Sequence, residues 1–145
     1  MRRPIVLTAV AAGLVFLYLV AFVYMVAFVA IQPTPAWWQN AFGTHRSAQL
    51  AWLLSFHAAG VVLVSLPFAF VIARVYPRLG IAVACVVTAV IWGTIDASLV
   101  IDAFTSAAFG ARGFWIANSV ELLGALPALV WLMQRLPSNN RWRGP

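Results

Sequence analysis

Residues 81–103 read IAVACVVTAVIWGTIDASLVIDA, a long apolar run that contains two aspartates, Asp96 and Asp102. A helix needs about 20 predominantly apolar residues to cross a bilayer. This run meets that length, and so do three others, at residues 5–31, 48–75 and 114–134. The sequence therefore predicts four transmembrane helices. It also raises the question of why one of them carries carboxyl groups.

The composition indicates the same class of protein. Of the 145 residues, 64% are hydrophobic and only 8% are charged, whereas soluble domains carry about 25% charged residues. Four spans leave too little chain for a soluble domain of about 50 residues. We therefore expect a single transmembrane domain over residues 1–145, an all-α, polytopic four-transmembrane-helix bundle, with a polar cytoplasmic tail at 135–145. The first span is about twice as long as the apolar part of a signal peptide, so we expect it to be retained.

The arginines predict the orientation, because Lys and Arg near span ends favour the cytoplasmic side of a membrane. Alternate span ends place seven arginines on one side and two on the other, which together account for all nine basic residues. The seven are Arg2, Arg3, Arg74, Arg78, Arg135, Arg141 and Arg143, and the two are Arg46 and Arg112. Both termini are therefore predicted to be cytoplasmic. The lack of lysine and the many alanines are typical of GC-rich bacterial genomes, so we expect a multi-pass protein of a bacterial cytoplasmic (inner) membrane.

Two connecting segments make local predictions. Pro33 and Pro35 should stop the first helix, and residues 36–42, AWWQNAF, predict a short helix in the membrane interface. The connection around residues 77–80 is tight, so the second and third spans should be antiparallel neighbours.

Small residues recur at every fourth position of the third span, at Cys85, Ala89, Gly93 and Ala97. Such a stripe allows two membrane helices to approach closely. It could serve the bundle itself, a second copy of the chain or another membrane protein.

Two functional classes are excluded or disfavoured by the residues present. The basic residues form no stripe interleaved with exposed aromatic side chains, so we expect no nucleic-acid partner. Cys85 is the single cysteine, which excludes an intramolecular disulfide and a cysteine-based metal motif.

Polar side chains from all four spans are predicted to share one layer of the outer leaflet. With a rise of about 1.5 Å per residue, Tyr24, Asp96 and Glu121 lie about 10 Å from the outer ends of their spans, and His57 about 14 Å. Asn118 lies one turn from Glu121 on the same helix face. An ionisable group in hydrocarbon costs roughly 2.5–3.5 kcal/mol even on the lenient insertion scale, so these groups should face the bundle interior. We expect His57 to contact at least one of the two carboxyl groups.

Two interpretations of this layer remain open. In the first, His57, Asp96 and Glu121 handle protons or bind a ligand, with Tyr24 and Asn118 as supporting hydrogen-bond groups. In the second, the same residues form a buried polar network that fixes the register of the helices.

A metal site and a boundary ion pair are further hypotheses. If His45 folded inward, it would join His57, Asp96 and Glu121 in a mixed nitrogen and oxygen set, which suits zinc, manganese or iron. Asp102 lies six residues from Asp96, near the outer boundary, and is expected to pair with Arg112 or Arg46.

The sequence leads to three functional hypotheses. The first requires no cofactor. It is an accessory, assembly or protective component that acts through helix contacts with another membrane protein. The second is a small transporter or channel, driven by protons or a divalent metal ion, that uses the His57, Asp96 and Glu121 cluster. The third is an intramembrane enzyme, which the sequence favours least. The expected partners are the lipid bilayer and either a membrane protein or a second copy of the chain.

Overall fold

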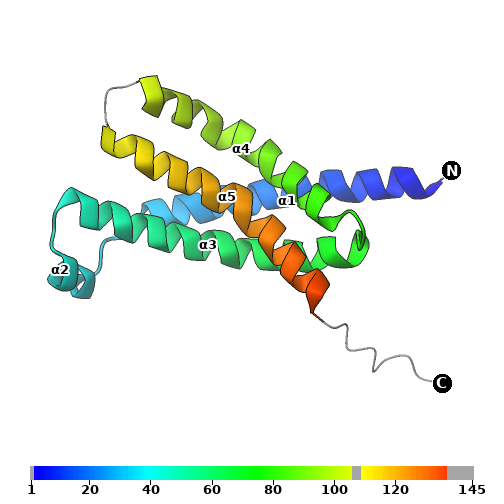
Figure 1. Ribbon diagram of the computed structural model, residues 1–145, viewed down its shortest axis with the longest axis horizontal. Coiled ribbons are helices and arrows are strands. Elements are labelled where there is room, and N and C mark those ends of the chain that lie inside the picture. The colour runs from blue at the N-terminus through cyan, green and yellow to red at the C-terminus, as the bar shows by residue number, and fades with distance from the viewer. Residues whose placement is uncertain (1, 106–108, 137–145) are drawn as a thin grey trace.

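The computed structural model describes residues 2–105 and 109–136, and all five elements that it contains there are α-helices (Figure 1). They are α1 (Arg2–Ala30), α2 (Ala36–Phe42), α3 (Arg46–Val75), α4 (Gly80–Thr105) and α5 (Phe109–Arg135). All except α2 are long and apolar enough to cross a membrane. This is the architecture of a multi-pass, all-helical membrane protein, as the sequence predicts. Most of the expected polar tail, residues 137–145, lies outside the described residues.

The long helices run lengthwise through the molecule and define two ends (Figure 1). One end, which we call the α2 end, holds α2, the end of α1, the start of α3, the end of α4 and the start of α5. The opposite end, which we call the terminal end, holds the start of α1, the turn from α3 to α4 and the end of α5. The start of the first helix and the end of the last therefore lie on the same side of the bundle.

The order of the helices around the bundle differs from the expectation. Helix α5 packs along both α3 and α4, and α1 packs mainly on α3 and less on α4. Helices α3 and α4 make few contacts with each other. The prediction that they are close antiparallel neighbours is therefore wrong, because α5 packs between them. A short turn brings helix ends together but does not decide which faces meet.

The predicted helix at residues 36–42 is present as α2. It begins directly after Pro35 and ends at Gly43, whose φ of 83° lies in a region that favours glycine. The Gln39 side chain donates to the Thr34 carbonyl at 2.8 Å, and the Trp38 indole donates to the Ala48 carbonyl at 2.9 Å. The first bond ties α2 to the segment that precedes it, and the second holds α2 against the start of α3.

The packed core runs along the axis of the bundle. Its fully buried side chains include Tyr18 and Phe22 of α1, Val61 and Ile72 of α3, Ile91 of α4, and Leu122, Leu126 and Val130 of α5. Lipid is as apolar as these side chains, so close packing and interhelical hydrogen bonds hold the helices together. One such bond joins the Tyr18 hydroxyl to the Ser65 hydroxyl at 2.7 Å, between α1 and α3.

The small-residue stripe of α4 does not pack inside the bundle. Cys85, Ala89 and Gly93 are all exposed, and a side chain built at Gly93 would meet nothing within 4 Å. The face of α4 that packs inward instead carries buried residues such as Val87 and Ile91. The stripe therefore forms part of the outer surface.

Candidate functional site

His57 and Glu121 form a contact between α3 and α5. The His57 Nδ1 atom lies 3.1 Å from Glu121 Oε2, and the two side chains are 7% and 22% exposed. Phe22 of α1 packs edge-on against the imidazole, with ring centroids 6.0 Å apart. The expected contact between His57 and a carboxyl group is confirmed, and three helices fix the position of the imidazole.

Asp96 and Asn118 form a second contact, between α4 and α5. The Asn118 amide donates to Asp96 Oδ2 at 3.2 Å, and both residues are buried, with Asp96 only 3% exposed. His57 is close enough to Asp96 for a Coulomb interaction. Asn118 and Glu121 lie about one turn apart on α5, so this helix supplies the polar partner of both contacts.

The two contacts adjoin a cavity of about 280 Å³ at the α2 end of the bundle. All four long helices line it, so it lies between them. Its polar wall consists of His57, Asp96 and Asn118. Its apolar wall consists of Val26, Val29, Ala30, Leu53, Ile95, Phe114 and Trp115. Asp96 is thus a buried residue that lines a partly open cavity between the helices.

The cavity has an apolar floor towards the terminal end. Phe22, Val61, Ile91 and Leu122, one from each long helix, are all fully buried. Each lies four or five residues from a cavity-lining residue of its own helix, which corresponds to about 6–8 Å along the axis. The cavity is therefore closed on the side that faces the terminal end.

The terminal end is also tied together by polar contacts. The Tyr76 hydroxyl donates to the Leu7 carbonyl of α1, and the Gln134 amide donates to the Pro77 carbonyl at 3.2 Å. Arg135 lies over the Trp131 ring at 4.1 Å, and Arg74 over a phenylalanine ring at 4.9 Å.

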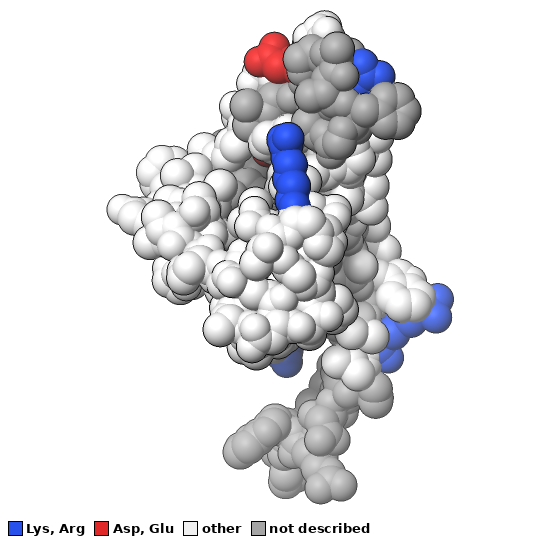
Figure 2. Space-filling model, turned by 90° about the vertical axis from the view of Figure 1, so that its left-hand side faces the viewer, with Lys and Arg blue, Asp and Glu red and all other residues white. Residues whose placement is uncertain are grey.

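Figure 2 shows the opposite, α2 end of the molecule. The visible surface there is largely uncharged and carries only isolated basic and acidic side chains.

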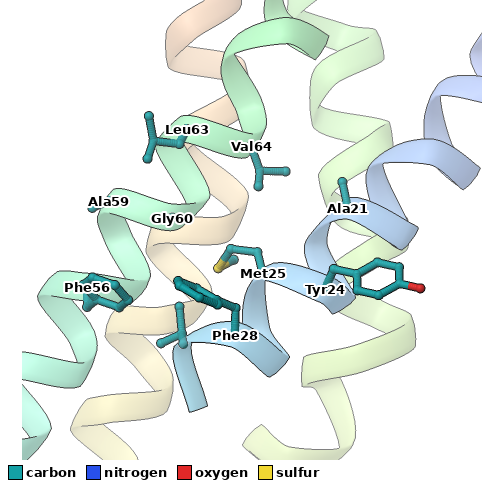
Figure 3. A pocket seen from close by; sticks show the side chains of 10 residues that line it. Ala21, Tyr24, Met25, Phe28, Phe56, Ala59, Gly60, Leu63 and Val64 are labelled. Carbon is teal, nitrogen blue, oxygen red and sulfur yellow. The ribbon is translucent and has the colours of Figure 1, made fainter. Parts of the chain in front are cut away.

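The prediction that Tyr24 belongs to the polar layer is wrong. Its side chain is 74% exposed, and its ring points away from α3 (Figure 3). The buried face of α1 carries Tyr18, Phe22, Met25 and Val29. Tyr24 follows Phe22 by two residues, or about 200° around the helix, so it faces outward. The depth of Tyr24 along its helix did not predict the direction in which its side chain points.

A groove lies beside Tyr24, between α1 and α3. It has a volume of about 380 Å³, and the Tyr24 ring lies at its edge while Met25 and Phe28 point towards α3 (Figure 3). Gly60 lets α1 approach closely, because a Cβ there would lie 2.7 Å from the Met25 sulfur. Apart from the Tyr24 phenol at its edge, the groove is lined by apolar residues.

His45 and Asp102 lie away from the cluster of His57, Asp96 and Glu121. His45 is exposed and directly precedes α3, about 18 Å along the helix axis from His57. Asp102 is exposed near the end of α4. Among residues 2–105 and 109–136, no three histidine, cysteine, aspartate or glutamate side chains come close enough to hold a metal ion. The hypothesis that His45 joins His57, Asp96 and Glu121 around a metal is therefore wrong for this arrangement.

Two polar pairs between helices, one buried and one partly buried, were not predicted from the sequence. One is the Tyr18–Ser65 bond, and the other is the bond from the Trp92 indole to the Ser119 hydroxyl at 3.0 Å. Ser65 lies eight residues after His57 and hence on the same face of α3. That spacing was a usable signal for Ser65, whereas nothing in the sequence singled out Ser119.

Comparisons of the chain with protein-family models, with characterised proteins and with solved structures gave no match. Its function must therefore be inferred from the residues of the site.

Proposed function

We propose that the protein is a small membrane carrier that binds a proton or a cation at Asp96. The observation that supports this most strongly is the position of that side chain. Asp96 is 3% exposed, yet it forms part of the wall of a cavity of about 280 Å³ that all four long helices line. Buried ionisable groups beside a cavity in a membrane helix are typical of ion and proton pathways.

The charges of the cluster support this proposal. Two carboxyl groups, Asp96 and Glu121, share one imidazole, His57, which can offset only one negative charge. The 3.1 Å contact pairs that imidazole with Glu121. Asn118 gives Asp96 a hydrogen bond but no charge. An uncompensated carboxylate in hydrocarbon is costly, so a proton or a bound cation must neutralise Asp96.

The floor of the cavity favours a carrier over an open channel. Fully buried side chains from all four long helices close the space below the cluster. A binding site that is closed towards one end of the bundle fits one of the two states that alternating access requires.

Proton flux in liposomes tests this proposal. The purified protein is reconstituted, a pH gradient is imposed, and the internal pH is followed with a trapped dye. Wild type should dissipate the gradient faster than empty liposomes, and Asp96→Asn should abolish this difference. Asp102→Asn, the same change at an exposed position of the same helix, is the matched control and should retain it. Equal flux in wild type and Asp96→Asn would favour a purely structural polar network.

We further propose that both termini are cytoplasmic and that the host is a bacterial inner membrane. The described arginines support this orientation, because Arg74, Arg78 and Arg135 lie towards the terminal end and Arg46 and Arg112 towards the α2 end. Fusion of a fluorescent protein, which matures only in the cytoplasm, to the C-terminus should give a bright fusion. A dark but stable fusion would reverse the orientation.

A second candidate function is an accessory component that binds another membrane protein through helix contacts. The outward-facing small residues of α4, Cys85, Ala89 and Gly93, favour it because such surfaces let helices approach closely. Replacing Gly93 by Leu should release a partner that co-purifies with wild type in mild detergent. Co-purification of no stoichiometric partner, or of one that Gly93→Leu leaves bound, would contradict this candidate.

A further inference from the structure

The residues that line the cavity indicate what Asp96 binds, provided that the proposed function at this residue holds. Most of the lining is hydrocarbon or aromatic, and the polar groups gather at Asp96, Asn118 and His57. A space with one polar patch and otherwise apolar walls suits a ligand with a polar head and an apolar body. It does not resemble a site for a small hydrated ion.

An inorganic cation finds too few ligands here. Calcium takes about six to eight oxygen ligands and magnesium about six, including retained waters. Zinc takes about three or four nitrogen, oxygen or sulfur ligands. The described residues provide no group of three candidate side chains close enough for a metal. One Asp96 oxygen already accepts a hydrogen bond from Asn118, and His57 Nδ1 contacts Glu121.

An ammonium group fits the polar patch better. It offers up to three hydrogen-bond donors and one positive charge, and Asp96 supplies an acceptor and the opposite charge. The His57–Glu121 contact is neutral overall when both side chains are ionised, so the charge that a ligand meets is that of Asp96. Trp115 and Phe114 place aromatic rings in the apolar wall of the same cavity, and aromatic rings bind a cation or a second ring favourably.

The size of the cavity limits the apolar body of the ligand. Pockets for drug-sized ligands span about 300–1,000 Å³, and the cavity, at about 280 Å³, lies just below this range. The ligand is therefore small. Leu53 of α3 and Ile95 of α4 line the cavity and would pack against its hydrocarbon part.

We propose that the cargo of this site is a small primary or secondary amine with an apolar body. Its ammonium group binds at Asp96 in the polar wall, beside Asn118 and His57, and its hydrocarbon or aromatic part lies against Leu53, Ile95 and Trp115. The amine replaces the proton that otherwise neutralises Asp96, so both compete for one carboxylate.

Calorimetric titration of the full-length protein in detergent tests this assignment. The probe is 2-phenylethylamine, and 2-phenylethanol is its neutral counterpart of similar shape. Wild type should bind the amine saturably and the alcohol at least tenfold more weakly. Asp96→Asn should weaken amine binding at least tenfold, and Asp102→Asn should leave it unchanged. Equal binding of the amine and the alcohol, or of the amine by wild type and Asp96→Asn, would overturn the assignment.

A second variant keeps the test independent of the folding of Asp96→Asn. Leu53→Trp fills the cavity from α3 and leaves Asp96 in place, so it should also abolish amine binding. Retention of binding in a folded Leu53→Trp protein, as judged by helical circular dichroism and gel filtration, would place the amine elsewhere and overturn the proposal.

The two proposals fail in different ways. Proton flux that depends on Asp96 without amine binding would leave the carrier proposal standing and eliminate the amine. Amine binding that depends on Asp96 without any proton flux would retain the amine site and eliminate the carrier.

Discussion

Removal of the His57–Glu121 contact should destabilise the bundle by a measurable amount. The perturbation is a double-mutant cycle with His57→Phe, Glu121→Gln and the double variant. Phenylalanine keeps a planar ring against Phe22, which packs edge-on against the imidazole. Glutamine keeps the size of Glu121 and removes its charge. Each single change thus removes the ion pair with little change in volume.

The magnitude follows from the distance and the exposure of the pair. When His57 is protonated, the two unit charges 3.1 Å apart attract by about 5 kcal/mol at an effective dielectric constant of about 20. Removal of each ion from water costs several kcal/mol, which cancels most of this attraction. Glu121 keeps 22% of its side chain exposed, so it is less enclosed by protein than His57, which is 7% exposed. Polar contacts between membrane helices average about 0.6 kcal/mol and reach about 1.7. We therefore expect a coupling free energy of about 1–1.5 kcal/mol.

The assay is reversible unfolding of the four proteins in mixed detergent micelles, with helical circular dichroism as the signal. The expected result is that the double variant loses about 1–1.5 kcal/mol less than the sum of the two single losses. Additive losses, within the usual margin of about 0.3–0.5 kcal/mol, would show that the 3.1 Å contact contributes no interaction energy.

Three further changes test packing and hydrogen bonding in the same unfolding assay. Gly60→Val should cost about 1–3 kcal/mol, because its Cβ would lie 2.7 Å from a methionine sulfur of α1, and a neutral effect would contradict the close approach of the helices. Tyr18→Phe should cost about 1 kcal/mol by removing a buried 2.7 Å bond to α3, whereas the control Tyr24→Phe, at a side chain 74% exposed, should change nothing. Equal effects of these two would contradict their opposite orientations. Trp52→Phe should be neutral or stabilising by up to about 1 kcal/mol, because the buried indole nitrogen has no hydrogen-bond partner among the described residues. Trp38→Phe removes a 2.9 Å bond and should cost about 1 kcal/mol, so a larger loss at Trp52 would refute this reasoning.

The elements of the fold follow closely from the sequence, because composition and chain breaks decide them. Apolar runs of sufficient length predict the four long helices, and the prolines before residue 36 predict where α2 begins. The arrangement of the helices does not follow in the same way. The short turn after α3 predicted that α4 would be its neighbour, but helix faces decide contacts, and α5 packs along both.

The sequence predicted the depth of the candidate site residues in the membrane but not the direction in which their side chains point. The rise per residue placed Asp96 and Glu121 at one depth, His57 slightly deeper and Asn118 one turn further out than Glu121. Of these residues, His57, Asp96 and Asn118 line one cavity. The same argument included Tyr24, which faces outward. Almost every residue of a membrane helix is apolar, so the sequence shows no polar face that would reveal its orientation. Which carboxyl group meets His57 also depends on packing, and the partner is Glu121.

For the same reason, the sequence did not predict whether the small-residue stripe of α4 faces the interior of the bundle or its outside. Small residues at every fourth position predict a surface that another helix can approach, but they do not say whether that helix belongs to the same chain. In the structure Gly93 is exposed with open space beside it.

Chemical labelling with dicyclohexylcarbodiimide, followed by peptide mass spectrometry, tests most directly whether Asp96 carries an exchangeable proton. This apolar reagent reacts with protonated carboxyl groups that it can reach. A carrier site at Asp96 predicts modification of Asp96 and protection of it by 2-phenylethylamine, while the exposed Asp102 remains unmodified. Modification of Asp102 or Glu121 with Asp96 untouched would contradict the proposed role of Asp96.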